Sequence, residues 1–212
     1  MGRLPKILGA IALAILLPLE MVGGQAAGAS ATEDYGGAVA PVQALHEALL
    51  MNMRQADALG FAGRRERLAP IIRRSFDFTT ISAVVLGASQ WKQLTEAQRS
   101  TMEETFRELT LATYADRFDG YSGEQFRIIS QRPLKQGRAL VRSELKAPDK
   151  DPVQLDYVLQ RVDDEWRIVN ILADGVSDLS VKRSEYSSIL RTDGFDHLID
   201  RLEEQIAELS AD

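Results

Sequence analysis

The hydrophobic period of the chain changes at Asp119-Gly120, and this change divides the sequence into two kinds of structure. Before it, apolar residues recur every three or four positions, as they do along one face of an α-helix. After it, apolar and polar residues alternate, as they do in half-buried strands. The helical spacing returns from about residue 178 onward. Helices, then consecutive strands, then helices again predict an α+β fold in which helices pack against an antiparallel sheet.

The helical segments have recognisable starts, stops and apolar faces. The clearest start is Thr95-Glu96-Ala97-Gln98, which fits a capping box because the Thr hydroxyl and the Gln three residues later satisfy free backbone amides. The segment that follows has an apolar face broad enough to contact neighbours on two sides. Helices are expected over residues 41–60, 64–74, 76–86, 95–118, 178–190 and 195–209.

The alternating segments predict a curved antiparallel meander of about four strands. Turn residues lie between them, so each strand is expected to pair with the next. The strands are expected over residues 125–130, 138–146, 153–162 and 165–173. The last strand is apolar on both faces, and we therefore expect it to be covered on both sides.

The first residues are typical of a secretory signal peptide. Arg3 and Lys6 precede an apolar run over residues 7–17, and Ala27-Gly28-Ala29 or Ala29-Ser30-Ala31 satisfies the cleavage rule. The run is shorter than the roughly 20 residues that a membrane anchor requires. We expect residues 1–31 to be removed on export by the general secretion route. Residues 32–40 are then expected to form a flexible lead-in, and residues 41–212 a single domain.

Composition excludes several functional classes. The formal net charge of −6 argues against nucleic-acid binding, which requires a concentrated basic surface. The absence of cysteine excludes disulfides, thiol catalysis and iron–sulfur clusters. His46 and His197 are far apart and have no partners at metal-ligand spacing, so both are expected to be structural or exposed. We expect no metal and no cofactor.

The sequence offers few candidates for acid–base catalysis. Asp156-Tyr157 is the only adjacent pair that resembles an acid–base site, but neighbours in a strand point to opposite faces of the sheet. Asp77 lies at an expected helix start, where aspartate commonly caps the helix. The sequence contains no nucleophile elbow, zinc-protease motif or glycine-rich phosphate loop. We therefore expect a protein that is not an enzyme.

Several segments, taken in order, resemble the MlaC family of periplasmic phospholipid-binding proteins, also known as toluene-tolerance proteins. They span nearly the whole chain after the leader. They are Phe76-Asp77-Phe78, Val85-Leu86-Gly87 with Trp91, Tyr114-Ala115, Leu155-Asp156-Tyr157, Glu165–Asn170, Gly175-Val176-Ser177, Ser184–Leu190, and Gly194-Phe195 with Leu198-Ile199.

The stretch Ala173–Leu179 is more similar to the hopanoid-biosynthesis-associated HpnM branch of this family. Two positions depart from the family pattern. Asn170 stands where members often carry aspartate, and Asp178 is an extra acidic residue after Gly-Val-Ser. These departures bear on the identity of the lipid more than on the fold.

The resemblance implies a nuclear-transport-factor-like sheet wrapped by helices around an apolar cavity. Lipid acyl chains would fill the cavity, and the headgroup would lie near the surface, so that residues 41–212 form a single lipid-binding domain. The implied partners are a phospholipid or hopanoid, an inner-membrane ABC transporter complex, an outer-membrane lipoprotein complex and, transiently, the membrane surface. By motif position, the lipid-binding candidates are Phe78, Ile81, Val85, Leu86, Trp91, Phe106, Leu109, Tyr114, Leu155, Tyr157, Trp166 and Ile168.

Three features of the sequence each allow two interpretations. The apolar residues either line a lipid pocket or fill an ordinary core, and a filled interior would favour a periplasmic adaptor of an ABC transport system. Arg64-Arg65 and Arg73-Arg74 either contact phosphate groups, a membrane or a partner, or belong to a solvated face. The residues after Gly175 either receive an anion at a helix start or contain an ordinary cap at Ser177 or Asp178.

Overall fold

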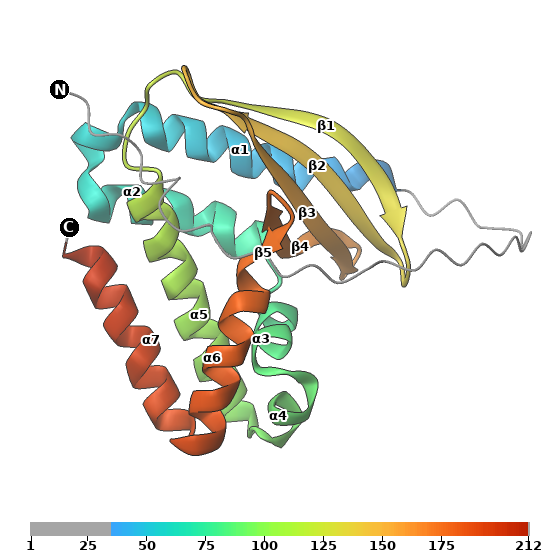
Figure 1. The fold of residues 1–212 in the computed structure, drawn as a ribbon, viewed down its shortest axis with the longest axis vertical. Helices are drawn as coiled ribbons and strands as arrows, with labels where there is room; N and C mark the ends of the chain where they lie inside the picture. The colour runs from blue at the N-terminus through green and yellow to red at the C-terminus, as the bar shows by residue number, and fades with distance from the viewer. Residues whose placement is uncertain (1–34, 212) are drawn as a thin grey trace, which may run out of the picture.

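The computed structural model describes residues 35–211, so the predicted signal peptide lies outside the described residues. It confirms the α+β class, with helices on either side of the strands in sequence (Figure 1). Before the strands come the 3-10 helix η2 (Tyr35–Ala38) and the α-helices α1 (Val39–Arg54), α2 (Ala56–Ser75), α3 (Phe78–Leu86), α4 (Ala88–Gln93) and α5 (Glu96–Arg117). After them come α6 (Asp178–Thr192) and α7 (Phe195–Ser210).

The sheet is the predicted antiparallel meander, with strand order β1-β2-β3-β4-β5. Its strands are β1 (Gln125–Leu134), β2 (Arg138–Lys146), β3 (Val153–Val162), β4 (Glu165–Ala173) and the two-residue β5 (Val176–Ser177). The register shifts between Ile128 and Ser130 in β1, and between Val158 and Leu159 in β3. Such irregularities bend a sheet, which accounts for its curvature.

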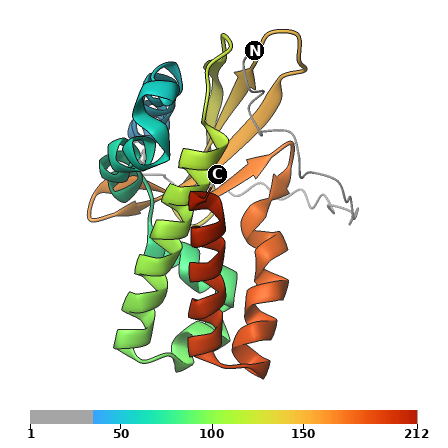
Figure 2. The ribbon, with the colours of Figure 1, turned by 90° about the vertical axis from the view of Figure 1, so that its left-hand side faces the viewer.

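Helices form the second layer of the molecule. Figure 1 shows α1 running along the sheet, while α5, α6 and α7 extend away from it. Figure 2 shows these three helices side by side from a second direction. α7 packs on α5, and α6 packs on α3. The buried side chains between these helices join those on the inner face of the sheet in one hydrophobic core. No helix among residues 35–211 is long and apolar enough to cross a membrane.

Asp77 joins the helical part to the sheet. Its backbone N–H donates to the Ile168 carbonyl at 3.0 Å, and its carboxylate accepts from the Thr80 N–H at 3.1 Å as the N-cap of α3. The same carboxylate accepts a hydrogen bond from Gln160 Nε2 at 2.8 Å. Asp77 is therefore a helix cap, as its position in the sequence indicated.

The helix boundaries near the N-terminus differ from those expected. The chain is helical from Tyr35, within the predicted lead-in, because Ala38 is fully buried and the Tyr35 ring packs 5.8 Å from that of Trp166. The first helix ends at Arg54 rather than at Gly60. Gly60 instead forms a kink within α2, where its positive φ of 60° suits a residue without a side chain.

The short elements α4 and β5 were not predicted. A helix of six residues and a strand of two residues are too short to show a hydrophobic period. β5 nevertheless matters for the site, because it leads directly into α6.

Candidate functional site

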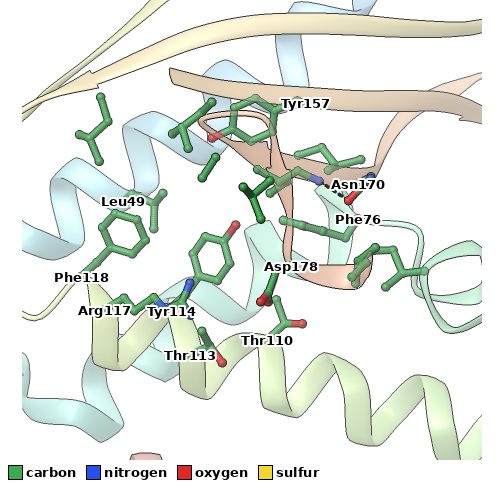
Figure 3. Close-up of a pocket in the computed structure, with 18 of the residues that line it drawn as sticks. Leu49, Phe76, Thr110, Thr113, Tyr114, Arg117, Phe118, Tyr157, Asn170 and Asp178 are labelled. Atoms are coloured by element: carbon green, nitrogen blue, oxygen red, sulfur yellow. Dashed lines mark hydrogen bonds between the residues drawn. The ribbon is translucent and has the colours of Figure 1, made fainter. Parts of the chain in front are cut away.

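A cavity of about 230 Å³ lies between the inner face of the sheet and α5, bordered by β5 and the start of α6 (Figure 3). Its walls are mainly apolar. The apolar lining consists of Leu49, Phe76, Ile81, Phe106, Leu109, Phe118, Phe126, Leu145, Val153, Leu155, Ile168, Ile171, Ala173, Val176 and Leu179. The residues with polar groups are Thr110, Thr113, Tyr114, Arg117, Tyr157, Asn170, Asp178 and Lys182.

The spacing of residues along the strands and along α5 determines which side chains face the cavity. On β3, Leu155 and Tyr157 are two positions apart and therefore point to the same inner face. Tyr157 pairs with Ile171 of β4, which adds a neighbouring lining residue. On α5, lining residues recur at three- and four-residue spacing from Phe106 to Arg117, so one stripe of the helix forms the opposite wall.

The interior wall of the cavity is uncharged at neutral pH. The Tyr157 hydroxyl lies 3.0 Å from His46 Nε2, and the His46 ring stacks on Phe126 with 4.3 Å between ring centroids. Burial lowers the pKa of His46 to about 4 and raises the pKa of the Tyr157 hydroxyl well above its ordinary value. His46 is therefore a buried structural histidine that holds Tyr157 in place.

The charged lining residues lie at the mouth. Arg117 and Asp178 are exposed and Lys182 is half-buried, whereas the apolar lining is buried or half-buried apart from Val176. Lys182 Nζ donates to the Tyr186 hydroxyl at 3.3 Å. α5 supplies one side of this mouth, and the start of α6 supplies the other.

Asn170 fixes the turn that carries the second side of the mouth. Its Oδ1 accepts hydrogen bonds from the Ile171 N–H and from Ser177 Oγ, both at 2.9 Å. Ser177 Oγ in turn accepts from the Ser180 N–H at 3.3 Å as the N-cap of α6. Asn170 therefore links β4 to the start of α6, and the cap predicted at Ser177 or Asp178 is Ser177.

The structure brings seven of the twelve candidate pocket residues together around the cavity. These are Ile81, Phe106, Leu109, Tyr114, Leu155, Tyr157 and Ile168. They come from α3, α5, β3 and β4. The predicted lipid-binding residues that line this one cavity are therefore up to 87 positions apart in the chain, from Ile81 to Ile168.

The other five candidates lie outside the cavity. Val85 and Leu86 are buried in the helical core, because α3 packs against both α5 and α6 and turns mainly Ile81 toward the cavity. Phe78 stacks on Phe76 with 5.9 Å between ring centroids. The remaining two are tryptophans. Trp91 lies under the guanidinium of Arg99, and Trp166 packs on Tyr35 and Arg161.

Some lining residues were missed although the sequence carried a signal for them. Thr113 and Arg117 follow Leu109 at four-residue spacing along α5, and Leu145 is an apolar residue of the alternating segment 138–146. Lys182 had no such signal, because its place at the mouth depends on how the β5 turn directs α6.

The first arginine pair is structural. Arg64 donates to the backbone carbonyls of Ala115 at 2.8 Å and Ala56 at 3.2 Å. Arg65 forms an ion pair with Glu108. Both arginines therefore tie α2 to α5, whereas Arg73 and Arg74 are exposed at the end of α2.

The one adjacent acid–base pair in the sequence is separated by the sheet. Asp156 accepts two hydrogen bonds from the Arg142 guanidinium, at 2.7 and 2.8 Å, whereas Tyr157 lines the cavity. Strand alternation places their side chains on opposite faces. Residues 35–211 also contain no group of three or more acidic or histidine side chains able to hold a metal ion.

Comparison with known proteins agrees with this architecture. The MlaC protein family model matches residues 43–204, which include all or part of every α-helix and strand described here. The chain is similar in structure to a phospholipid-binding protein from Ralstonia solanacearum solved in complex with a phospholipid. The TM-score is 0.71 at 20% sequence identity, over 82% of this chain and 98% of that one. The shared fold and the extent of the family match show that this chain belongs to the MlaC family.

Proposed function

We propose that this protein is a periplasmic lipid shuttle that carries a phospholipid or a hopanoid-like lipid between the inner and outer membranes. The observation that carries the proposal is the apolar cavity between sheet and helices in a member of the MlaC family. The related Ralstonia protein binds a phospholipid, which supports a lipid as the ligand. The predicted signal peptide supports the periplasm as the compartment.

The apolar walls supply the required binding energy without any headgroup chemistry. Burial of one methylene contributes about 0.8 kcal/mol, so some thirty methylenes contribute on the order of 20 kcal/mol before association costs are subtracted. The family and the cavity both favour binding over catalysis, and Tyr157 and His46 then serve as an uncharged wall rather than as an acid–base pair.

The cavity must expand to hold a lipid with two acyl chains. Its volume of about 230 Å³ falls below the roughly 300–1,000 Å³ of typical small-molecule pockets. α5 on one side and β5 with the start of α6 on the other border the mouth. Separation of these two sides is the motion that would admit the chains.

Amide exchange tests this gate. In lipid-free protein, α5 and α6 are expected to exchange their amides faster than β2, β3 and β4, because opening requires α5 to separate from β5 and the start of α6. Lipid is expected to slow the exchange of the helices toward that of the strands. Hydrogen-exchange mass spectrometry measures both states. Equal protection of helices and strands without lipid would contradict the gate.

The partners we propose are an inner-membrane ABC transporter complex and an outer-membrane lipoprotein complex. The lipid itself is either a phospholipid or, as the Ala173–Leu179 stretch indicates, a hopanoid of the HpnM type.

A vesicle assay tests the shuttle. Donor vesicles with labelled phospholipid and heavier acceptor vesicles are mixed with the protein, and the acceptors are recovered by sedimentation. We expect the label in the acceptors to increase in proportion to protein concentration, and parallel donors containing a hopanoid test the second lipid. A protein that transfers neither lipid would be better explained as an adaptor.

A further inference from the structure

The mouth of the cavity carries charges of both signs. Arg117 from α5 and Lys182 from α6 are cationic, and Asp178 at the start of α6 is anionic. In the part of the chain that the structure describes, none of the three belongs to an ion pair. Their charges therefore remain available to a ligand at the opening.

Tyr114 lies close to both of the opposite charges. Burial is the main cause that raises the pKa of its hydroxyl, the Arg117 guanidinium lowers it, and the Asp178 carboxylate raises it further. Figure 3 shows the Tyr114 ring between Arg117 and Asp178. Both charges thus act on the same hydroxyl group.

Lys182 adds a second cation on the α6 side. It follows Asp178 by four positions, so the two side chains share one face of the helix. Its ammonium group is held by the Tyr186 hydroxyl at 3.3 Å and lies 5.7 Å from the centre of the Tyr186 ring. The lining of the mouth therefore includes two cations and one carboxylate.

We propose that this mouth selects phospholipids whose headgroup carries an amine beside the phosphate. The phosphate lies against Arg117 and Lys182, and the ammonium lies against Asp178. A headgroup that ends in hydroxyl groups carries the same phosphate but no ammonium, so it leaves Asp178 without a cationic partner. This selection rests on the proposed lipid binding and names the class of lipid that the same pocket prefers.

Competition from mixed vesicles tests the selection. The protein is incubated with vesicles of equimolar phosphatidylethanolamine and phosphatidylglycerol with identical acyl chains, then re-isolated, and its lipids are quantified by mass spectrometry. Because both lipids come from the same vesicles, differences in vesicle attraction do not bias their ratio, and the effect of the protein's net charge of −6 is measured with a charge-matched variant. Exposed ion pairs are weak, so we expect about two- to five-fold enrichment of phosphatidylethanolamine. Added salt is expected to reduce the enrichment.

Two variants assign the effect to one residue. Asp178→Asn is expected to bring the bound ratio to that of the vesicles, and Asp178→Lys is expected to favour phosphatidylglycerol. Glu203→Gln, an exposed site on α7 with the same change in charge as Asp178→Asn, is expected to keep the wild-type ratio.

Each outcome has a distinct meaning. Wild-type protein that loads lipid at the vesicle ratio overturns the selection but leaves the carrier intact. Enrichment that survives in Asp178→Asn overturns the assignment to Asp178. Protein that takes up neither phospholipid contradicts selection and phospholipid carriage together.

Discussion

Substitution of Ile171 by tryptophan is expected to lower the affinity for lipid at least fivefold. Ile171 lines the cavity beside Tyr157, and its side chain points to the inner face of β4. An indole at this position takes space that an acyl chain needs, and overpacking typically costs about 1–3 kcal/mol, or roughly a five- to 150-fold loss in affinity. Occupancy is measured by native mass spectrometry after incubation with phospholipid vesicles.

The adjacent residue provides a matched control. Leu172 is half-buried on the opposite face of β4, where it pairs with Asp156. Leu172→Trp makes the same change in size on the same strand, and we expect it to keep wild-type occupancy. Equal loss in both variants would show that the sheet, rather than the cavity, is affected. Full occupancy in Ile171→Trp would show that acyl chains bind elsewhere.

Acidification is expected to destabilise the wild-type protein through His46. Burial lowers its pKa from 6.5 to about 4, so the fold favours the neutral ring. The stabilisation is complete above pH 6.5, the value of the unfolded chain, and is lost as the pH falls toward 4. A pKa difference of this size corresponds to about 3 kcal/mol of unfolding free energy over that interval.

His46→Gln isolates this contribution from that of the carboxylates, which also titrate below pH 6. The glutamine amide retains a group able to hydrogen-bond Tyr157 but does not titrate. Urea unfolding at pH 7 and at pH 4.5 measures both proteins. We expect the wild type to lose more stability on acidification than the variant. An equal loss in the two proteins would place the acid sensitivity elsewhere.

Strand alternation and helix capping could be predicted from the sequence, because both depend on residues that are close together in the chain. The alternation of β3 places Leu155 and Tyr157 on one face and Asp156 on the other, and the structure agrees. The capping box at Thr95 starts α5 as expected, with Gln98 completing it. Such features depend on spacing and short-range hydrogen bonds, which a single sequence contains.

The candidate site was less predictable where the choice of helix face depends on distant neighbours. Val85 and Leu86 have the composition of pocket residues, but α3 is covered by α5 and α6 and buries them in a core. Trp166 shares an alternating strand with Ile168, yet Tyr35 covers it. Lys182 reaches the mouth only because Asn170 and Ser177 fix the turn before α6.

Native mass spectrometry of the protein purified from the cells that produce it tests the central claim most directly. Lipid carriage predicts one lipid bound to each chain, with the mass of a phospholipid, or of a hopanoid if the protein acts as its HpnM-like stretch indicates. Denaturing analysis of the same sample identifies the lipid. Protein that is recovered from these cells without lipid, and that stays empty after incubation with vesicles, would contradict lipid carriage.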